Sequence, residues 1–87
     1  MAIVNADPEK LKQLAKTFTS SASQLEQVAR AMRRALDQSG WNDSERQKFE
    51  VDFSATVKTL NQFTEKLKGQ YAIELNKKAA SLDQYGR

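Results

Sequence analysis

Two stretches of amphipathic helical pattern, separated by one turn signal near the middle of the 87-residue chain, constrain the fold most strongly. The signal is the segment Ser39-Gly40-Trp41-Asn42-Asp43, which contains the only tryptophan of the chain. On both sides of it apolar residues recur every three or four positions, the spacing of one helix face. The sequence therefore predicts an all-α protein with two helical arms of similar length.

The first arm begins at a clear helix start signal. Asp7 places a capping carboxylate before Pro8, whose fixed φ suits the first helical position. The apolar stripe then keeps its phase as far as Gly40, a residue suited to the left-handed conformation that closes helices. Ser and Thr residues between 17 and 23 weaken this arm, but no Gly or Pro supports a break, so one helix over about 8–39 is preferred to two. Its stripe contains Leu11, Leu14, Phe18, Leu25, Val28 and Met32.

The second arm restarts at once. Asn42 and Glu45, three positions apart, have the form of a capping box, which leaves a turn of only residues 40–42. A helix over about 43–81 is predicted, with a flexible tail to residue 87. The apolar steps lengthen around Leu67, and the last two turns are expected to be the looser end. The stripe of this arm contains Phe49, Phe53, Val57, Leu60, Phe63, Leu67 and Tyr71.

The length of the arms and the short turn predict the architecture. Helices of about 35 residues are roughly 50 Å long, and a short turn between two of them requires an antiparallel hairpin. Residues 1–87 then form a single domain. The apolar stripes are too broad to be covered within one hairpin. A second hairpin, identical or similar, is expected to complete a dimeric four-helix bundle.

Composition excludes most chemistry. The chain has no cysteine and no histidine, which argues against disulfides, thiolate chemistry, histidine-dependent triads and nearly all zinc sites. Its carboxylates fall on predicted helix surfaces with nothing to desolvate or pair them, so no catalytic residue and no cofactor is expected. The formal net charge is +3. Acids interleave with the basic residues of the first arm, so a solvated face is favoured over a nucleic-acid or acidic-lipid surface; these residues are Lys12, Lys16, Arg30, Arg33 and Arg34.

Membrane and signal segments are not expected either. No apolar run approaches the ~20 residues that cross a bilayer, so stable membrane insertion is not predicted. Residues 1–6 lack the basic segment and apolar stretch of a Sec-type signal. Export by a system that reads folded substrates stays open.

The residues quoted above resemble a known family. An Asp7-Pro8 start, a central Trp41 turn and Phe49 at the eighth position after the tryptophan are similar, over essentially the whole chain, to the WXG-type small helical hairpins of type VII secretion, the early-secreted-antigen-like proteins. The resemblance implies homodimers or heterodimers without a cleavable signal peptide. Such proteins are exported folded by a membrane-embedded ATPase machine, or they escort larger substrates.

This chain departs from the family pattern at two places. Asp43 stands two positions after the tryptophan, where the family has glycine. Tyr71 is followed four residues later by Leu75, where the family's export signal has Asp or Glu. The turn geometry is therefore expected to differ, and a partner would have to supply the export signal unless the chain is not exported this way.

Three functional hypotheses follow. The leading one is a secreted substrate or escort, cytoplasmic before export, that dimerises and displays its turn to a secretion ATPase, a similar hairpin or a larger cargo protein. The alternative is an intracellular dimerisation module or adaptor that is not itself secreted. The third is a membrane-surface or nucleic-acid binder. Whether Trp41 closes the core or is presented to a partner stays open, and the candidate recognition residues are Gly40, Trp41, Asn42 and Asp43.

Overall fold

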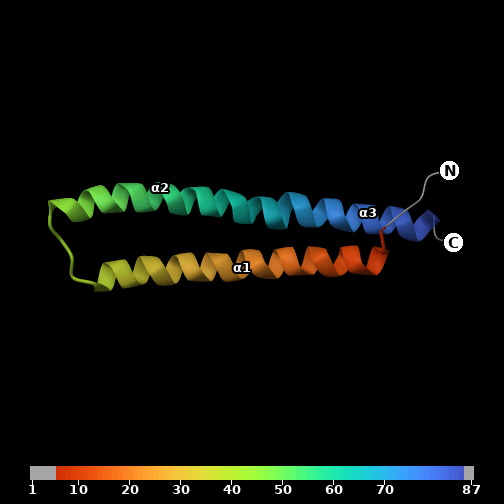
Figure 1. Cartoon of the computed structure of the whole chain (residues 1–87), viewed down its shortest axis with the longest axis horizontal. Helices are drawn as coiled ribbons and strands as arrows, with labels where there is room; N and C mark the ends of the chain where they lie inside the picture. Colours follow the sequence, from red (N-terminus) through yellow and green to blue (C-terminus); the bar gives the residue numbers. More distant parts are fainter. Residues whose placement is uncertain (1–5, 86–87) are drawn as a thin grey trace.

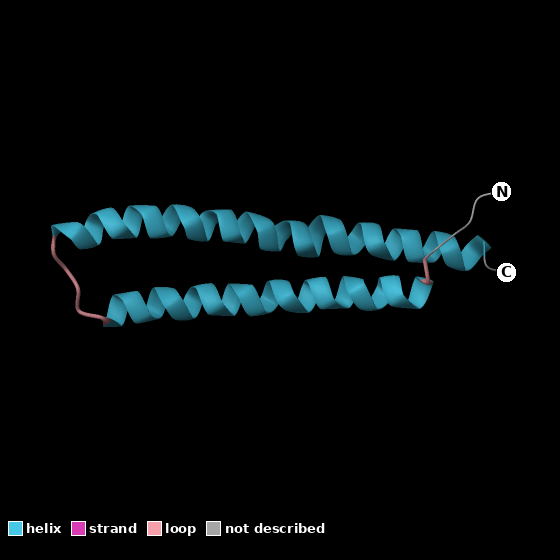
Figure 2. Ribbon diagram, in the orientation of Figure 1, coloured by secondary structure: helices cyan, strands magenta, loops and turns pink. Residues whose placement is uncertain are grey.

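The chain folds into an antiparallel helical hairpin (Figure 1). This computed structural model describes residues 6–85, without the side chain of Tyr85. The molecule measures 65 × 19 × 16 Å, so it is one long rod two helices wide. Within the described residues the only secondary structure is helical (Figure 2). The predicted all-α hairpin is confirmed.

The first arm is one uninterrupted helix, α1, Pro8–Gln38. Asp7 caps it as predicted, because its Oδ1 accepts a 2.9 Å hydrogen bond from the backbone N–H of Glu9. The Ser- and Thr-rich segment does not break the helix. In that segment the Thr19 hydroxyl donates to the carbonyl oxygen of Ala15 at 3.0 Å, which satisfies it within the helix.

The second arm is longer than predicted and changes its winding once. It consists of α2 (Ser44–Lys66), a π-helical segment η1 (Leu67–Tyr71) and α3 (Ala72–Tyr85). The π-helical segment coincides with the lengthened apolar steps around Leu67, because one additional residue per turn restores the phase of the stripe. The predicted helix end near residue 81 is wrong by one turn, since Leu82 is buried against the hairpin. Whatever remains of the predicted tail lies outside the described residues.

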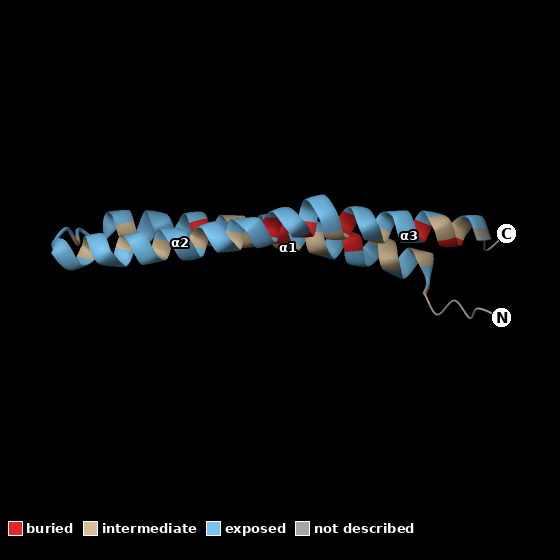
Figure 3. Ribbon diagram, turned by 90° about the horizontal axis from the view of Figure 1, so that it is seen from above, coloured by how far each residue is buried: buried red, intermediate tan, exposed pale blue. Residues whose placement is uncertain are grey.

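The core is built mainly from alanines. Ala15, Ala22 and Ala29 of α1 recur every seven residues and are buried, and they face the second arm. On that arm Ala72 and Ala79 are also buried. Small side chains let two helices approach closely, which compensates for the low helix propensity of the neighbouring Ser and Thr residues. Figure 3 shows the buried positions along the contact between the arms.

The tightest packing lies at the end of the hairpin opposite the turn. Ala79 is fully buried and Leu82 is only 7% exposed, whereas Met32 and Phe49 near the turn are 44% and 46% exposed. The expectation that the last two turns would be the looser end is therefore wrong. The reason is that η1 corrects the register before α3 begins, so α3 keeps its small residues directed at α1.

Candidate functional site

The turn that carries Trp41 is a short, hydrogen-bonded connection. Gly40 has a φ of +75°, the left-handed conformation predicted for it. Ser39 closes α1, because its hydroxyl and its backbone N–H both donate to the carbonyl oxygen of Leu36. The Ser39 oxygen in turn accepts a 3.3 Å hydrogen bond from the backbone N–H of Trp41. These hydrogen bonds fix the path of the chain from the end of α1 to Trp41.

Asp43 is the residue that opens the second arm. Its Oδ1 accepts hydrogen bonds from the backbone N–H groups of Glu45 and Arg46 at 3.0 and 3.1 Å. The prediction that Asn42 caps this helix in a capping box with Glu45 is therefore wrong by one residue. Both Asn and Asp are good capping residues, so their order in the sequence did not distinguish them. The cap belongs to the position where the WXG-type pattern has glycine.

The same carboxylate also holds the tryptophan side chain. The indole Nε1 of Trp41 donates a 2.8 Å hydrogen bond to Asp43 Oδ1. The indole lies 5.4 Å from the ring of Phe49, centroid to centroid, and Phe49 stacks on Phe53 at 5.9 Å. Trp41 is half-buried and Phe49 is exposed. Trp41 therefore does both things that the sequence left open: it packs on Phe49 at the end of the apolar stripe, and part of its side chain stays accessible to a partner.

Arg46 fixes the turn from the other side. Its Nη1 donates to the carbonyl oxygen of Trp41 at 2.6 Å, and its Nη2 lies 3.2 Å from Asp37 and 3.5 Å from Glu50. The Arg46 side chain is only 16% exposed, so it joins the end of α1 to the start of α2. Sequence reasoning missed this residue, because Arg46 reads as an ordinary charged position of a first helical turn.

The predicted stripe residues divide into covered and uncovered positions. Leu67 is buried, and Phe18 and Tyr71 are half-buried and meet edge to face with ring centroids 6.4 Å apart. Five of the predicted stripe residues are left uncovered; we call them the apolar face, and they are Leu14, Val28, Met32, Phe49 and Phe63. The remaining stripe residues are half-buried, namely Leu11, Leu25, Phe53, Val57 and Leu60.

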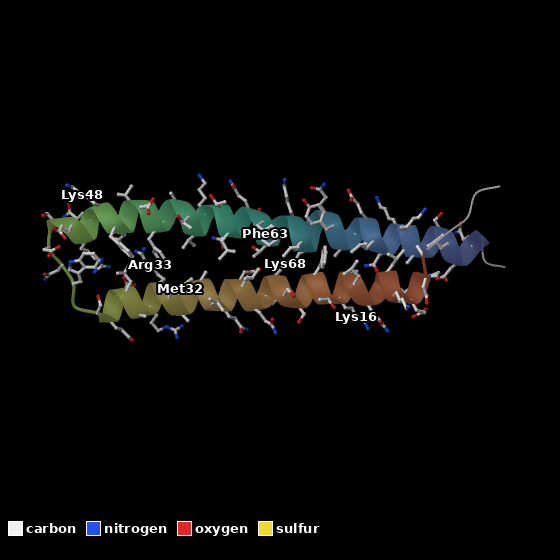
Figure 4. The ribbon with its side chains drawn as sticks, viewed as in Figure 1. Lys16, Met32, Arg33, Lys48, Phe63 and Lys68 are labelled. Atoms are coloured by element: carbon white, nitrogen blue, oxygen red, sulfur yellow. The ribbon has the colours of Figure 1, made fainter. Side chains whose placement is uncertain are left out.

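The opposite side of the hairpin carries the ion pairs between the arms, apart from the Arg46–Asp37 pair at the turn. Met32 and Arg33 lie three and four residues after the buried Ala29, and so flank it on opposite sides. Phe63, one residue before the buried Thr64, and Lys68, four residues after it, also flank it on opposite sides. The four flanking residues are labelled in Figure 4. We call the side of Arg33 and Lys68 the polar face. Its ion pairs are Lys12–Asp83, Glu26–Lys68 and Arg33–Glu50.

In two of these pairs the pKa of one member is shifted in the direction that favours its charged form. The hydrogen bond from Lys68 to Glu26, at 2.5 Å, lowers the pKa of the Glu26 carboxyl, with smaller contributions from the charges of Lys68 and Arg30. The hydrogen bond from Lys12 to Asp83 raises the pKa of the lysine, and the charges of Asp83 and Glu9 add to it. Of the five basic residues predicted to lie on a solvated face, Lys12 and Arg33 form ion pairs with the second arm.

Comparisons with known proteins identify no relative: no family model, no curated protein and no solved structure matches this chain. Among residues 6–85 no helix is long and apolar enough to span a membrane. Nor does that part of the chain bring together three or more acidic side chains that could hold a metal ion. The features on which a function can be argued are therefore the Trp41 turn and the two faces.

Proposed function

We propose that this protein is a non-enzymatic substrate or escort of a type VII secretion system, similar to the WXG-type hairpins. It would act by pairing with a second hairpin and displaying its turn to a translocation ATPase or to cargo. The observation that carries the proposal is the Trp41 turn. One carboxylate, Asp43, both caps α2 and holds the indole, at one end of a 65 Å rod.

The apolar face supports the pairing step. Val28 is 52% exposed and Phe63 is 49% exposed, although both belong to otherwise regular stripes. Large apolar side chains gathered on one side of a monomer typically mark a protein interface. The polar face lies on the other side, so two hairpins that meet through their apolar faces form a four-helix bundle with the ion pairs outside.

The test of this function is secretion in cells that carry a type VII translocation ATPase. Trp41→Ala is expected to leave helical circular dichroism unchanged and to abolish the appearance of the protein, or of its co-expressed cargo, in the culture supernatant. Trp41→Phe keeps an aromatic ring without the indole N–H and serves as the graded control. Normal secretion of Trp41→Ala would refute the displayed turn as the signal.

One observation favours the second candidate function, an intracellular adaptor. Tyr71, the residue at the place of the family's export tyrosine, is half-buried in η1 and packs against Phe18. A tyrosine engaged in the core is poorly placed for recognition by an export machine. For an adaptor we expect no protein in the supernatant under any condition, together with co-purification of a cytoplasmic partner that is lost in Phe63→Glu.

A further inference from the structure

A groove lies on the polar face, between α1 and α2. It has a volume of about 540 Å³, within the range of ordinary ligand sites. Its floor is apolar and consists of Ala29, Phe53 and Val57. Because Phe53 and Val57 are half-buried rather than covered, the floor offers apolar surface to an incoming side chain. This surface is separate from the apolar face, since the polar face lies on the other side of Ala29.

The ends of the groove are defined by two of the ion pairs between the arms. Glu26–Lys68 and Arg33–Glu50 lie seven residues apart along α1, about 10 Å at the rise of an α-helix. The groove therefore accommodates a short segment, about two helical turns or three extended residues.

The rim of the groove carries a net positive charge, with four basic side chains against two acidic ones. Its basic side chains are Arg30, Arg33, Lys58 and Lys68, and its acidic ones are Glu26 and Glu65. Within residues 6–85, Arg30 and Lys58 form no ion pair, and both side chains are exposed. They come from opposite arms, so cations stand on both walls of the same groove.

We propose that this groove binds a short acidic segment of a partner protein, with one apolar side chain on the floor and carboxylates on Arg30 and Lys58. The apolar floor favours a ligand that also carries an apolar side chain, and the two cations, Arg30 and Lys58, favour a ligand with negative charge. The site does not depend on the proposed secretion function. A bundle formed through the apolar face leaves it open, so the groove and the Trp41 turn contact different parts of a complex.

The experiment measures fluorescence anisotropy of a short fluorescein-labelled peptide in which one leucine is flanked by glutamates, titrated with the full chain. The double variant Arg30→Glu/Lys58→Glu is expected to weaken binding at least about tenfold. The matched control Lys10→Glu/Lys48→Glu makes the same change in net charge at exposed lysines that do not line the groove. We expect it to weaken binding less than about twofold. Circular dichroism of both variants checks that the hairpin is intact.

The peptide itself is varied as a second readout that leaves the protein untouched. Replacing its leucine by serine, or its glutamates by glutamines, is expected to remove binding, because both the floor and the rim then lose their ligand. Equal loss in the two double variants would overturn the proposal, as would peptide binding that does not need the leucine. A third outcome would assign the basic rim to nucleic acid instead. In that case single-stranded DNA displaces the peptide from both the wild type and Lys10→Glu/Lys48→Glu, and replacing the leucine of the peptide does not change its binding.

Discussion

Trp41 and Asp43 share one hydrogen-bonding oxygen: the carboxylate oxygen that caps α2 also accepts the indole N–H. The start of the second arm and the orientation of the tryptophan are thereby coupled. A substitution that removes the cap also releases the side chain that we propose is recognised.

The first prediction concerns this shared oxygen. Asp43→Ala is expected to cost about 0.5–2 kcal/mol of unfolding free energy, because the N–H groups of Glu45 and Arg46 lose their acceptor. The emission of Trp41, the only tryptophan, should move to longer wavelength as the indole is released into water. Asp43→Asn keeps an accepting oxygen, so its unfolding free energy and its emission wavelength should both stay close to those of the wild type. Urea unfolding followed by tryptophan fluorescence measures the two effects together, and an unchanged emission in Asp43→Ala would contradict the coupling.

The second prediction concerns the alanine contact between α1 and α3. Ala22 has no exposed surface, so a larger side chain there must push the helices apart. Ala22→Leu is expected to lower the unfolding free energy by about 1–3 kcal/mol in chemical denaturation. Ala55→Leu places the same side chain on an exposed helix position and should change it by less than about 0.5 kcal/mol. Equal effects of the two variants would show that the arms are not closely packed.

The third prediction concerns pairing of hairpins. Light scattering at tens of micromolar should give twice the mass of one chain for wild type and the mass of one chain for Phe63→Glu, because a charge on the apolar face opposes burial. The matched control is Val51→Glu, since Val51 is 73% exposed and, two residues after Phe49, lies on the other side of α2 from that ring. It should remain dimeric. A wild-type monomer would contradict self-association and leave only a different hairpin as the partner.

The fourth prediction concerns acid sensitivity. Lys68 lowers the pKa of Glu26 in the folded state below its ordinary value of 4.5. The pair therefore stabilises the fold above pH 4.5, and this contribution is lost as the pH falls through the lowered pKa. Thermal unfolding should show a difference between wild type and Glu26→Gln at neutral pH that disappears on acidification. Lys68→Gln should remove the same pH dependence, and a difference that persists at low pH would rule out the ion pair as its cause.

Helix periodicity and end signals in the sequence were sufficient to predict the hairpin, its turn and its first cap. Those features depend on local rules: Asp7 before Pro8, Gly40 at a positive φ, and apolar residues in phase along each arm. The α2 cap was misplaced by one residue, since Asn42 and Asp43 satisfy the same local rule. Contacts within the turn favour Asp43, because its carboxylate also accepts the Trp41 indole N–H while Arg46 binds the Trp41 carbonyl oxygen.

The parts of the site that depend on contact between the arms were not predictable from the pattern. A stripe of apolar residues shows which side of a helix is apolar, but not which part of that side faces the neighbouring arm. In the structure the alanines of α1 face the second arm, whereas Val28 and Met32 lie beside that contact and remain exposed. Arg30 and Lys58 were equally ordinary surface positions in the sequence, and only the spacing of the arms places them on the two walls of one groove.

The rod has its turn at one end and the start of α1 beside α3 at the other, where the end of α3 extends past the start of α1 (Figure 1). Because α1 has 31 residues, a fluorophore, affinity tag or carrier protein attached before α1 is held roughly 5 nm from Trp41. One attached after α3 is held on the order of 6 nm away, since the long dimension is 65 Å. Both attachment points are therefore remote from the recognition end. The start of α1 and the end of α3 lie at the same end of the rod. A hairpin tethered to a surface beyond either of them therefore presents Trp41 away from that surface.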